Sequence, residues 1–125
     1  MSLAWLVTLG IVVQAALAGQ GWFVTPDLLV LHGGVGHGVL TLAVVLTVAV
    51  VVRHRVGLPS ALSLLLVIGL VAQTGLGYAG RRGELALASS VHIPLGVIVL
   101  GLAVALVVWL SLARRTQPDT AAGGA

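Results

Sequence analysis

Four long apolar stretches constrain the fold of this chain more than any other feature. They cover about residues 3–19, 28–52, 59–78 and 85–112. A helix needs about 17–25 mostly apolar residues to cross the hydrocarbon core of a bilayer, so each stretch is long enough. Backbone N–H and C=O groups find no water there, which favours helices over open strands. The sequence therefore predicts an all-α, integral membrane four-helix bundle within residues 1–113.

The composition supports this fold class and excludes several functions. Of the 125 residues, 59% are hydrophobic and only 7% are charged, whereas a soluble domain carries about 25% charged residues. So few charges exclude a nucleic-acid-binding surface and make the lipid bilayer the expected partner. The chain has no cysteine, which excludes disulfides, thiolate metal ligands and cysteine nucleophiles.

The arginines predict how the chain is oriented in the membrane. With four membrane crossings, the loop between the second and third stretches lies on the same side as both termini. Four arginines lie on that side: Arg53, Arg55, Arg114 and Arg115. Only Arg81 and Arg82 lie on the other side. The positive-inside rule then predicts a multi-pass protein of the inner (plasma) membrane with both termini in the cytoplasm. Residues 114–125 have no apolar face and are expected to form a disordered cytoplasmic tail.

The first stretch has a second interpretation. Ala16, Leu17 and Ala18 resemble a signal-peptide cleavage site, but residues 1–10 contain no Lys or Arg, and a signal peptide has a positive start. The favoured interpretation keeps the first helix. A three-helix respiratory anchor with a cleaved first helix is the alternative.

The chain contains an internal repeat. The segment HGGVGHGVLTLAVVLTV resembles HIPLGVIVLGLAVALVV. The informative matches pair His32 with His92, Gly36 with Gly96 and Gln14 with Gln73. Each half, about 3–55 and 60–115, is then a helical hairpin with a glutamine late in its first helix and a histidine early in its second. At 1.5 Å per residue, the two histidines and two glutamines are expected to lie at one depth near the outer face.

This polar layer has the composition of a haem site. Two neutral imidazoles on facing helices supply the axial ligands of a b-type haem iron, so His32 and His92 are the predicted metal ligands. A porphyrin is a flat plate that needs space between helices. Gly33, Gly36 and Gly96 are expected to provide that space.

Other polar residues fit the same site. Gln14 and Gln73 are expected to bond the ring nitrogens that do not bind iron. Arg81 and Arg82, in the outer loop, are expected to pair with the haem propionates. The alternative is that the histidines and glutamines only hydrogen-bond one helix to another.

Two further histidines are not predicted ligands. His37 lies about 140° around the helix from His32, so it cannot face the same partner. It is interpreted as a packing or proton-relay residue. His54 lies in the segment RHR and is interpreted as a solvated rim residue.

Several segments resemble a known family. AQTGLGYAG followed by VHIPLGVIVLGLAVAL, and VVQAALAG followed by LHGGVGHGVLTL, resemble one four-helix half of the haem A synthase family. They also resemble small four-helix bacterial membrane proteins of the same layout. The likeness covers about residues 8–112 and implies that His32 and His92 bind haem. The family carries a glutamate one turn before the first histidine, where this chain has Leu28, and it has two four-helix halves rather than one.

The sequence thus favours a cytochrome b-like membrane protein with one haem b held by two histidines. Its role would be electron transfer, haem handling or redox sensing, beside a respiratory or redox membrane partner or as a homodimer. No Ser-His-Asp set, carboxylate pair or phosphate loop points to an enzyme. Two alternatives stay open: a haem A synthase-like enzyme acting as a dimer, and a haem-free structural or accessory subunit.

Overall fold

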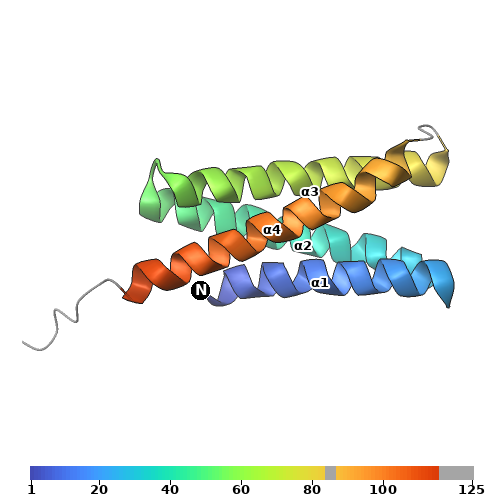
Figure 1. The fold of residues 1–125 in the computed structure, drawn as a ribbon, viewed down its shortest axis with the longest axis horizontal. Coiled ribbons are helices and arrows are strands. Elements are labelled where there is room, and N and C mark those ends of the chain that lie inside the picture. The colour runs from blue at the N-terminus through green and yellow to red at the C-terminus, as the bar shows by residue number, and fades with distance from the viewer. Residues whose placement is uncertain (84–86, 116–125) are drawn as a thin grey trace, which may run out of the picture.

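The described part of the chain forms four long helices, each antiparallel to the one before it (Figure 1). The computed structural model describes residues 1–83 and 87–115, and this part of the chain contains no strand. The helices are α1 (Ser2–Phe23), α2 (Leu28–His54), α3 (Leu58–Arg82) and α4 (Ala88–Arg115).

Each helix is long and apolar enough to cross a membrane. Large apolar side chains cover the outside of the bundle, including Leu9, Val48, Leu65 and Val104. A soluble bundle would carry charges there, whereas a bilayer requires such a surface. The prediction of an all-α four-helix bundle of membrane-crossing helices is confirmed.

The helix ends differ from the predicted ones by a few residues. The first helix was expected to end near residue 19 and the third near residue 78, but they continue to Phe23 and Arg82. The apolar stretch marks the hydrocarbon core, and helical hydrogen bonding continues beyond it. Gly83 ends α3 in the left-handed conformation, at φ 68°, which glycine adopts without strain.

The fourth helix also differs from its predicted limits. It begins at Ala88 and continues to Arg115, so Arg114 and Arg115 are helical and do not belong to a disordered tail. The predicted start at residue 85 and the tail residues 116–125 lie outside the described residues.

The helices form a closed ring in chain order. Packed pairs are α1 with α2, α2 with α3, α3 with α4 and α1 with α4, which leaves α2 and α4 diagonally opposed. Val7, Leu66, Val99 and Leu106 are fully buried in the core. A side chain on the inner face of α2 therefore meets one from α4 only across the bundle interior.

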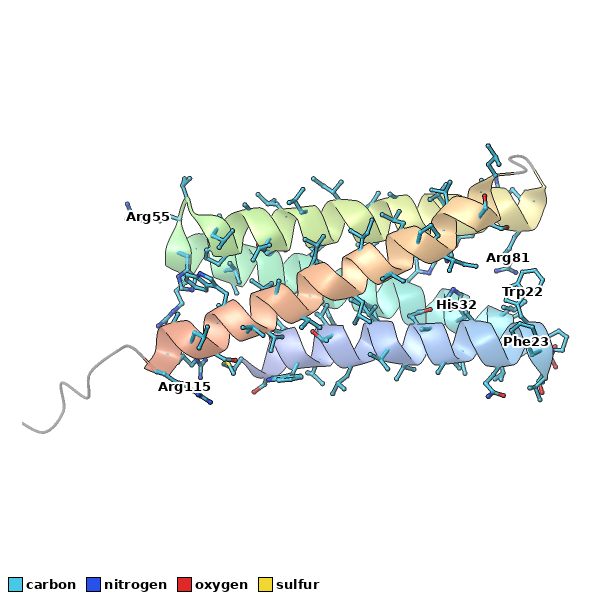
Figure 2. The ribbon with its side chains drawn as sticks, viewed as in Figure 1. Trp22, Phe23, His32, Arg55, Arg81 and Arg115 are labelled. Atoms are coloured by element: carbon cyan, nitrogen blue, oxygen red, sulfur yellow. The ribbon has the colours of Figure 1, made fainter. Side chains whose placement is uncertain are left out.

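The two ends of the bundle differ in chemistry (Figure 2). We call the end that carries Arg55 and Arg115 the arginine-rich end. At the opposite end lie Trp22, Phe23 and Arg81, with His32 nearby, and we call it the histidine end.

Close helix contact in each hairpin depends on one glycine. A Cβ on Gly10 would lie 2.6 Å from Val39 Cγ2, and a Cβ on Gly69 would lie 2.7 Å from Val99 Cγ2. Both distances are shorter than real Cβ contacts. Each glycine therefore lets a valine of the next helix press against its backbone.

We predict that Gly69→Ala destabilises the bundle because Val99 or the helix must move. Overpacking of this kind costs about 1–3 kcal/mol. Gly101→Ala is the matched control, since a Cβ there meets nothing within 4 Å and alanine favours the helix by about 0.5–1 kcal/mol. Unfolding in detergent measures both variants, and equal effects would contradict this packing.

Candidate functional site

His32 and His92 face each other across the interior at the histidine end. Their ring centroids are 6.3 Å apart and their planes are inclined by 67°. His32 lies in the second turn of α2 and His92 in the second turn of α4. Both are partly buried. The structure thus brings the two predicted ligand residues together from diagonally opposed helices.

A hydrogen bond fixes the tautomer of His32. Its Nδ1 lies 3.0 Å from the backbone carbonyl oxygen of Gln14. A carbonyl oxygen only accepts, so Nδ1 carries the proton and donates it. The other ring nitrogen, Nε2, then keeps its lone pair. A neutral imidazole with this tautomer is ready to bind a metal through Nε2.

The bond to His32 comes from a different group than the sequence suggested. We expected the Gln14 side chain to bond the imidazole ring. Instead the Gln14 main chain does so, and the Gln14 side-chain Nε2 donates to the backbone carbonyl of His32 at 2.8 Å. Two hydrogen bonds therefore join α1 to α2 at one point and orient the ring.

The second hairpin has the same residues but leaves polar atoms without partners. His92 Nδ1 and Gln73 Oε1 are buried and make no hydrogen bond of standard geometry with the described residues, although the Gln73 main chain lies near enough to interact with the His92 ring. The His92 ring lies against Gly77, where an added Cβ would be 3.4 Å from Cε1. Buried polar atoms without partners are few in native proteins and mark strain or a missing ligand. His92 is therefore the less firmly held of the two imidazoles.

The predicted glycines lie against side chains of neighbouring helices. A Cβ on Gly36 would lie 3.0 Å from Gln14 Nε2, and one on Gly96 would lie 2.8 Å from Gln73 Nε2. Gly36 and Gly96 thus admit a glutamine of the neighbouring helix, whereas Gly33 meets Arg81 of α3. That these glycines give space to a porphyrin stays a prediction.

The two predicted arginines are placed differently. Arg81 reaches from α3 to α2, where its Nη1 would be 3.7 Å from a Cβ on Gly33 (Figure 2). This guanidinium therefore lies against α2 at the residue that follows His32. The Arg82 guanidinium carbon lies 5.9 Å from the ring centroid of Tyr78, a cation–π contact.

The other two histidines lie apart from the pair. His37 donates from Nδ1 to the Gly33 carbonyl at 2.7 Å, and Tyr78 donates to its Nε2 at 3.2 Å. His54 packs edge-on against Trp109 at 5.2 Å, at the arginine-rich end. The His37–Tyr78 bond was not foreseen, since no sequence pattern pairs these residues across α2 and α3.

The donor set fits a metal that brings other ligands with it. No group of three or more His, Cys, Asp or Glu side chains within residues 1–83 and 87–115 could hold a metal ion. Metal–imidazole bonds are about 2.0–2.1 Å long, so imidazoles on opposite sides of one metal have ring centres about 6 Å apart. The ring centroids of His32 and His92 are 6.3 Å apart in an edge-to-face arrangement, which is close to that separation. The residues present fit the axial pair of a haem better than a bare ion.

Comparisons with known proteins add no relative. No protein-family model matches the chain, and neither a curated protein nor a solved structure matches it. The chemistry of the site is therefore argued from its own residues.

We predict that Gln14→Met weakens the link between α1 and α2. It removes the bond from Nε2 to the His32 carbonyl, and hydrogen bonds between membrane helices contribute about 0.6–2 kcal/mol. The matched control is Gln20→Met, which changes an exposed glutamine of the same helix. Thermal unfolding in detergent should show a loss for Gln14→Met alone. A loss of the same size for Gln20→Met would contradict the role of this bond.

Proposed function

We propose that this protein is a membrane cytochrome that holds one b-type haem between α2 and α4 at the histidine end. His32 and His92 would bind its iron. The protein then acts in electron transfer, haem handling or redox sensing.

One observation carries the proposal: two imidazoles from diagonal helices face each other at 6.3 Å. The His32 tautomer supports it, since Nδ1 is engaged by Gln14 and Nε2 is left for a metal. Ionisable groups inside a membrane are costly, which favours a functional role over packing alone.

When bound, a haem supplies one-electron redox chemistry. His32 and His92 would hold the iron of that haem, and both histidines would then be engaged and not open to a substrate. Arg81, near His32, would pair with a propionate and hold the edge of the haem at the membrane surface. This arrangement favours electron transfer over oxygen chemistry.

The proposal includes an internal repeat and a membrane orientation. Two pairs of contacts support the repeat. Gly10 meets Val39 as Gly69 meets Val99, and Gln14 meets Gly36 as Gln73 meets Gly96. Such a parallel repeat would give both histidines the same depth. The positive-inside rule places the arginine-rich end in the cytoplasm, and the haem then lies toward the outer face of the inner membrane.

A haem A synthase-like activity is the weaker proposal. The residue one turn before His32 is Leu28, where the family carries a glutamate. The nearest described acid is Asp27, which is exposed at the N-terminus of α2. A haem-free accessory subunit is the other candidate, and the two bonds between Gln14 and His32 favour it, since they already join two helices.

An absorption spectrum of the purified protein tests the proposal. Wild-type protein expressed with ample haem should show a Soret band, with sharp α and β bands after reduction by dithionite. His32→Ala and His92→Ala should each lose the six-coordinate spectrum. His37→Ala and His54→Ala are the matched controls and should keep it. A colourless wild type would contradict the haem and leave the accessory-subunit interpretation.

The midpoint potential should report the position of Arg81. A positive charge near haem stabilises the reduced form, so Arg81→Gln should lower the potential, on the order of tens of millivolts. Arg82→Gln should have a smaller effect because Arg82 lies over Tyr78. Redox titration of both variants gives the comparison. A larger shift for Arg82→Gln would contradict the placement of Arg81 beside the haem.

A further inference from the structure

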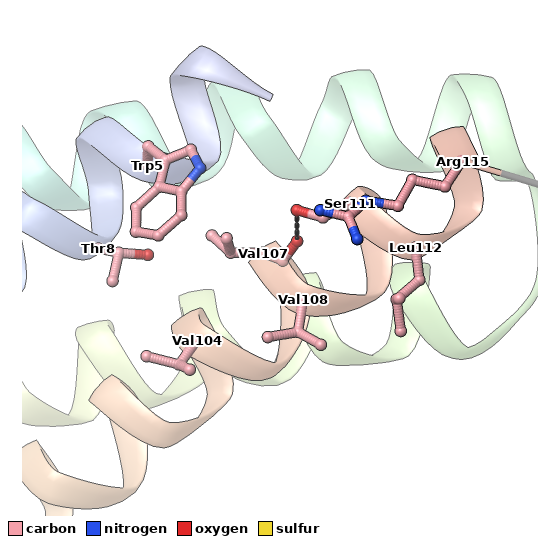
Figure 3. Close-up of a pocket in the computed structure, with 8 residues that line it drawn as sticks. All are labelled: Trp5, Thr8, Val104, Val107, Val108, Ser111, Leu112 and Arg115. Carbon is pink, nitrogen blue, oxygen red and sulfur yellow. Dashed lines mark hydrogen bonds between the residues drawn. The ribbon is translucent and has the colours of Figure 1, made fainter.

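A groove lies on the outer surface of the bundle between α1 and α4 (Figure 3). Its volume is about 200 Å³. Thr8 and Val107 are buried and form its floor, while Val104, Val108 and Leu112 are exposed along its side. In a bilayer this apolar side faces the acyl chains.

One end of the groove is polar. Arg115 lies there, at the last residue of α4, with Ser111 one turn before it (Figure 3). The Ser111 hydroxyl donates to the Val107 carbonyl at 2.7 Å. Trp5 borders the groove from α1 and is 49% exposed. Tryptophan is typical of the level of the lipid headgroups, so the groove passes from the interface into the hydrocarbon core.

The length of the groove matches one leaflet. Val104 and Arg115 are eleven residues apart on α4 (115 − 104), which corresponds to about 16 Å along the helix. The hydrocarbon core of a bilayer is about 30 Å thick, so one leaflet contributes about 15 Å. This span is therefore long enough for one acyl chain whose headgroup lies near Arg115.

The positive charge at the arginine-rich end favours a lipid with an anionic headgroup. A second cavity of about 180 Å³ lies at the same end, lined by Arg53, His54 and Arg114. Asp27 is the one acidic residue in the described part of the chain, and it lies at the start of α2, at the other end. Basic pockets between membrane helices on the cytoplasmic side bind anionic headgroups.

We propose that an anionic phospholipid of the leaflet at the arginine-rich end occupies this groove. One acyl chain lies along the α4 wall, and the phosphate pairs with the Arg115 guanidinium. The lipid covers the seam between α1 and α4, the least extensive of the four helix contacts. It completes the ring of helices there, independently of any haem at the histidine end.

Trp5 provides a local reporter for a test on the full chain. In a Trp22→Phe, Trp109→Phe background, Trp5 is the remaining tryptophan. The probes are phosphatidylglycerol and phosphatidylcholine with brominated acyl chains, which quench a tryptophan that they touch. We expect phosphatidylglycerol to quench Trp5 at a mole fraction several-fold lower than phosphatidylcholine.

Two arginine variants separate the groove from general surface charge. Arg115→Gln should reduce the preference for phosphatidylglycerol by about fivefold, the effect of losing one arginine at an anionic surface. Arg55→Gln, at the same end but not lining the groove, should leave it unchanged. Equal quenching by both lipids, or equal effects of both variants, would overturn the proposal. The proposal would also be overturned if Trp5 emission did not change with lipid but changed with protein concentration, because a second copy of the chain would then cover the groove.

Discussion

Polar groups inside this bundle have no bulk water to bond, and that constraint shapes both the packing and the candidate site. The Thr47 hydroxyl finds protein partners instead of water, because it donates to the carbonyls of Ala43 and Ser63 at 2.8 and 3.0 Å. Gln14 and His32 do the same through two hydrogen bonds between α1 and α2. His92 Nδ1 and Gln73 Oε1 make no hydrogen bond of standard geometry with the described residues. An unpaired buried polar atom destabilises a fold. These two atoms belong to the second hairpin, and one of them is on an imidazole of the histidine pair.

Much of the fold and part of the site could be predicted from the sequence. Apolar length alone predicts four membrane-crossing helices, because the thickness of the bilayer is fixed. It does not locate helix ends, which is why α1 and α3 continue to Phe23 and Arg82. Similarity between the two halves predicted that His32 and His92 would share a depth, and the structure brings their rings together.

The finer parts of the site depend on atoms that no sequence pattern specifies. The sequence cannot tell whether the side chain or the main chain of Gln14 bonds the imidazole. Nor does it reveal that Gly36 admits a glutamine, because that depends on how closely two helices approach. The reach of Arg81 toward Gly33 depends on the length of α3 beyond its apolar stretch. These details decide which nitrogen of His32 is available and which arginine lies near it.

We propose that His32 and His92 together bind one haem iron. Electron paramagnetic resonance of the oxidised, purified wild type at low temperature tests it most directly, because two strong axial imidazoles give a low-spin ferric iron. We predict one low-spin signal in the wild type and a high-spin signal when His92→Ala retains haem. A high-spin wild type, or protein without haem iron after expression with ample haem, would contradict it.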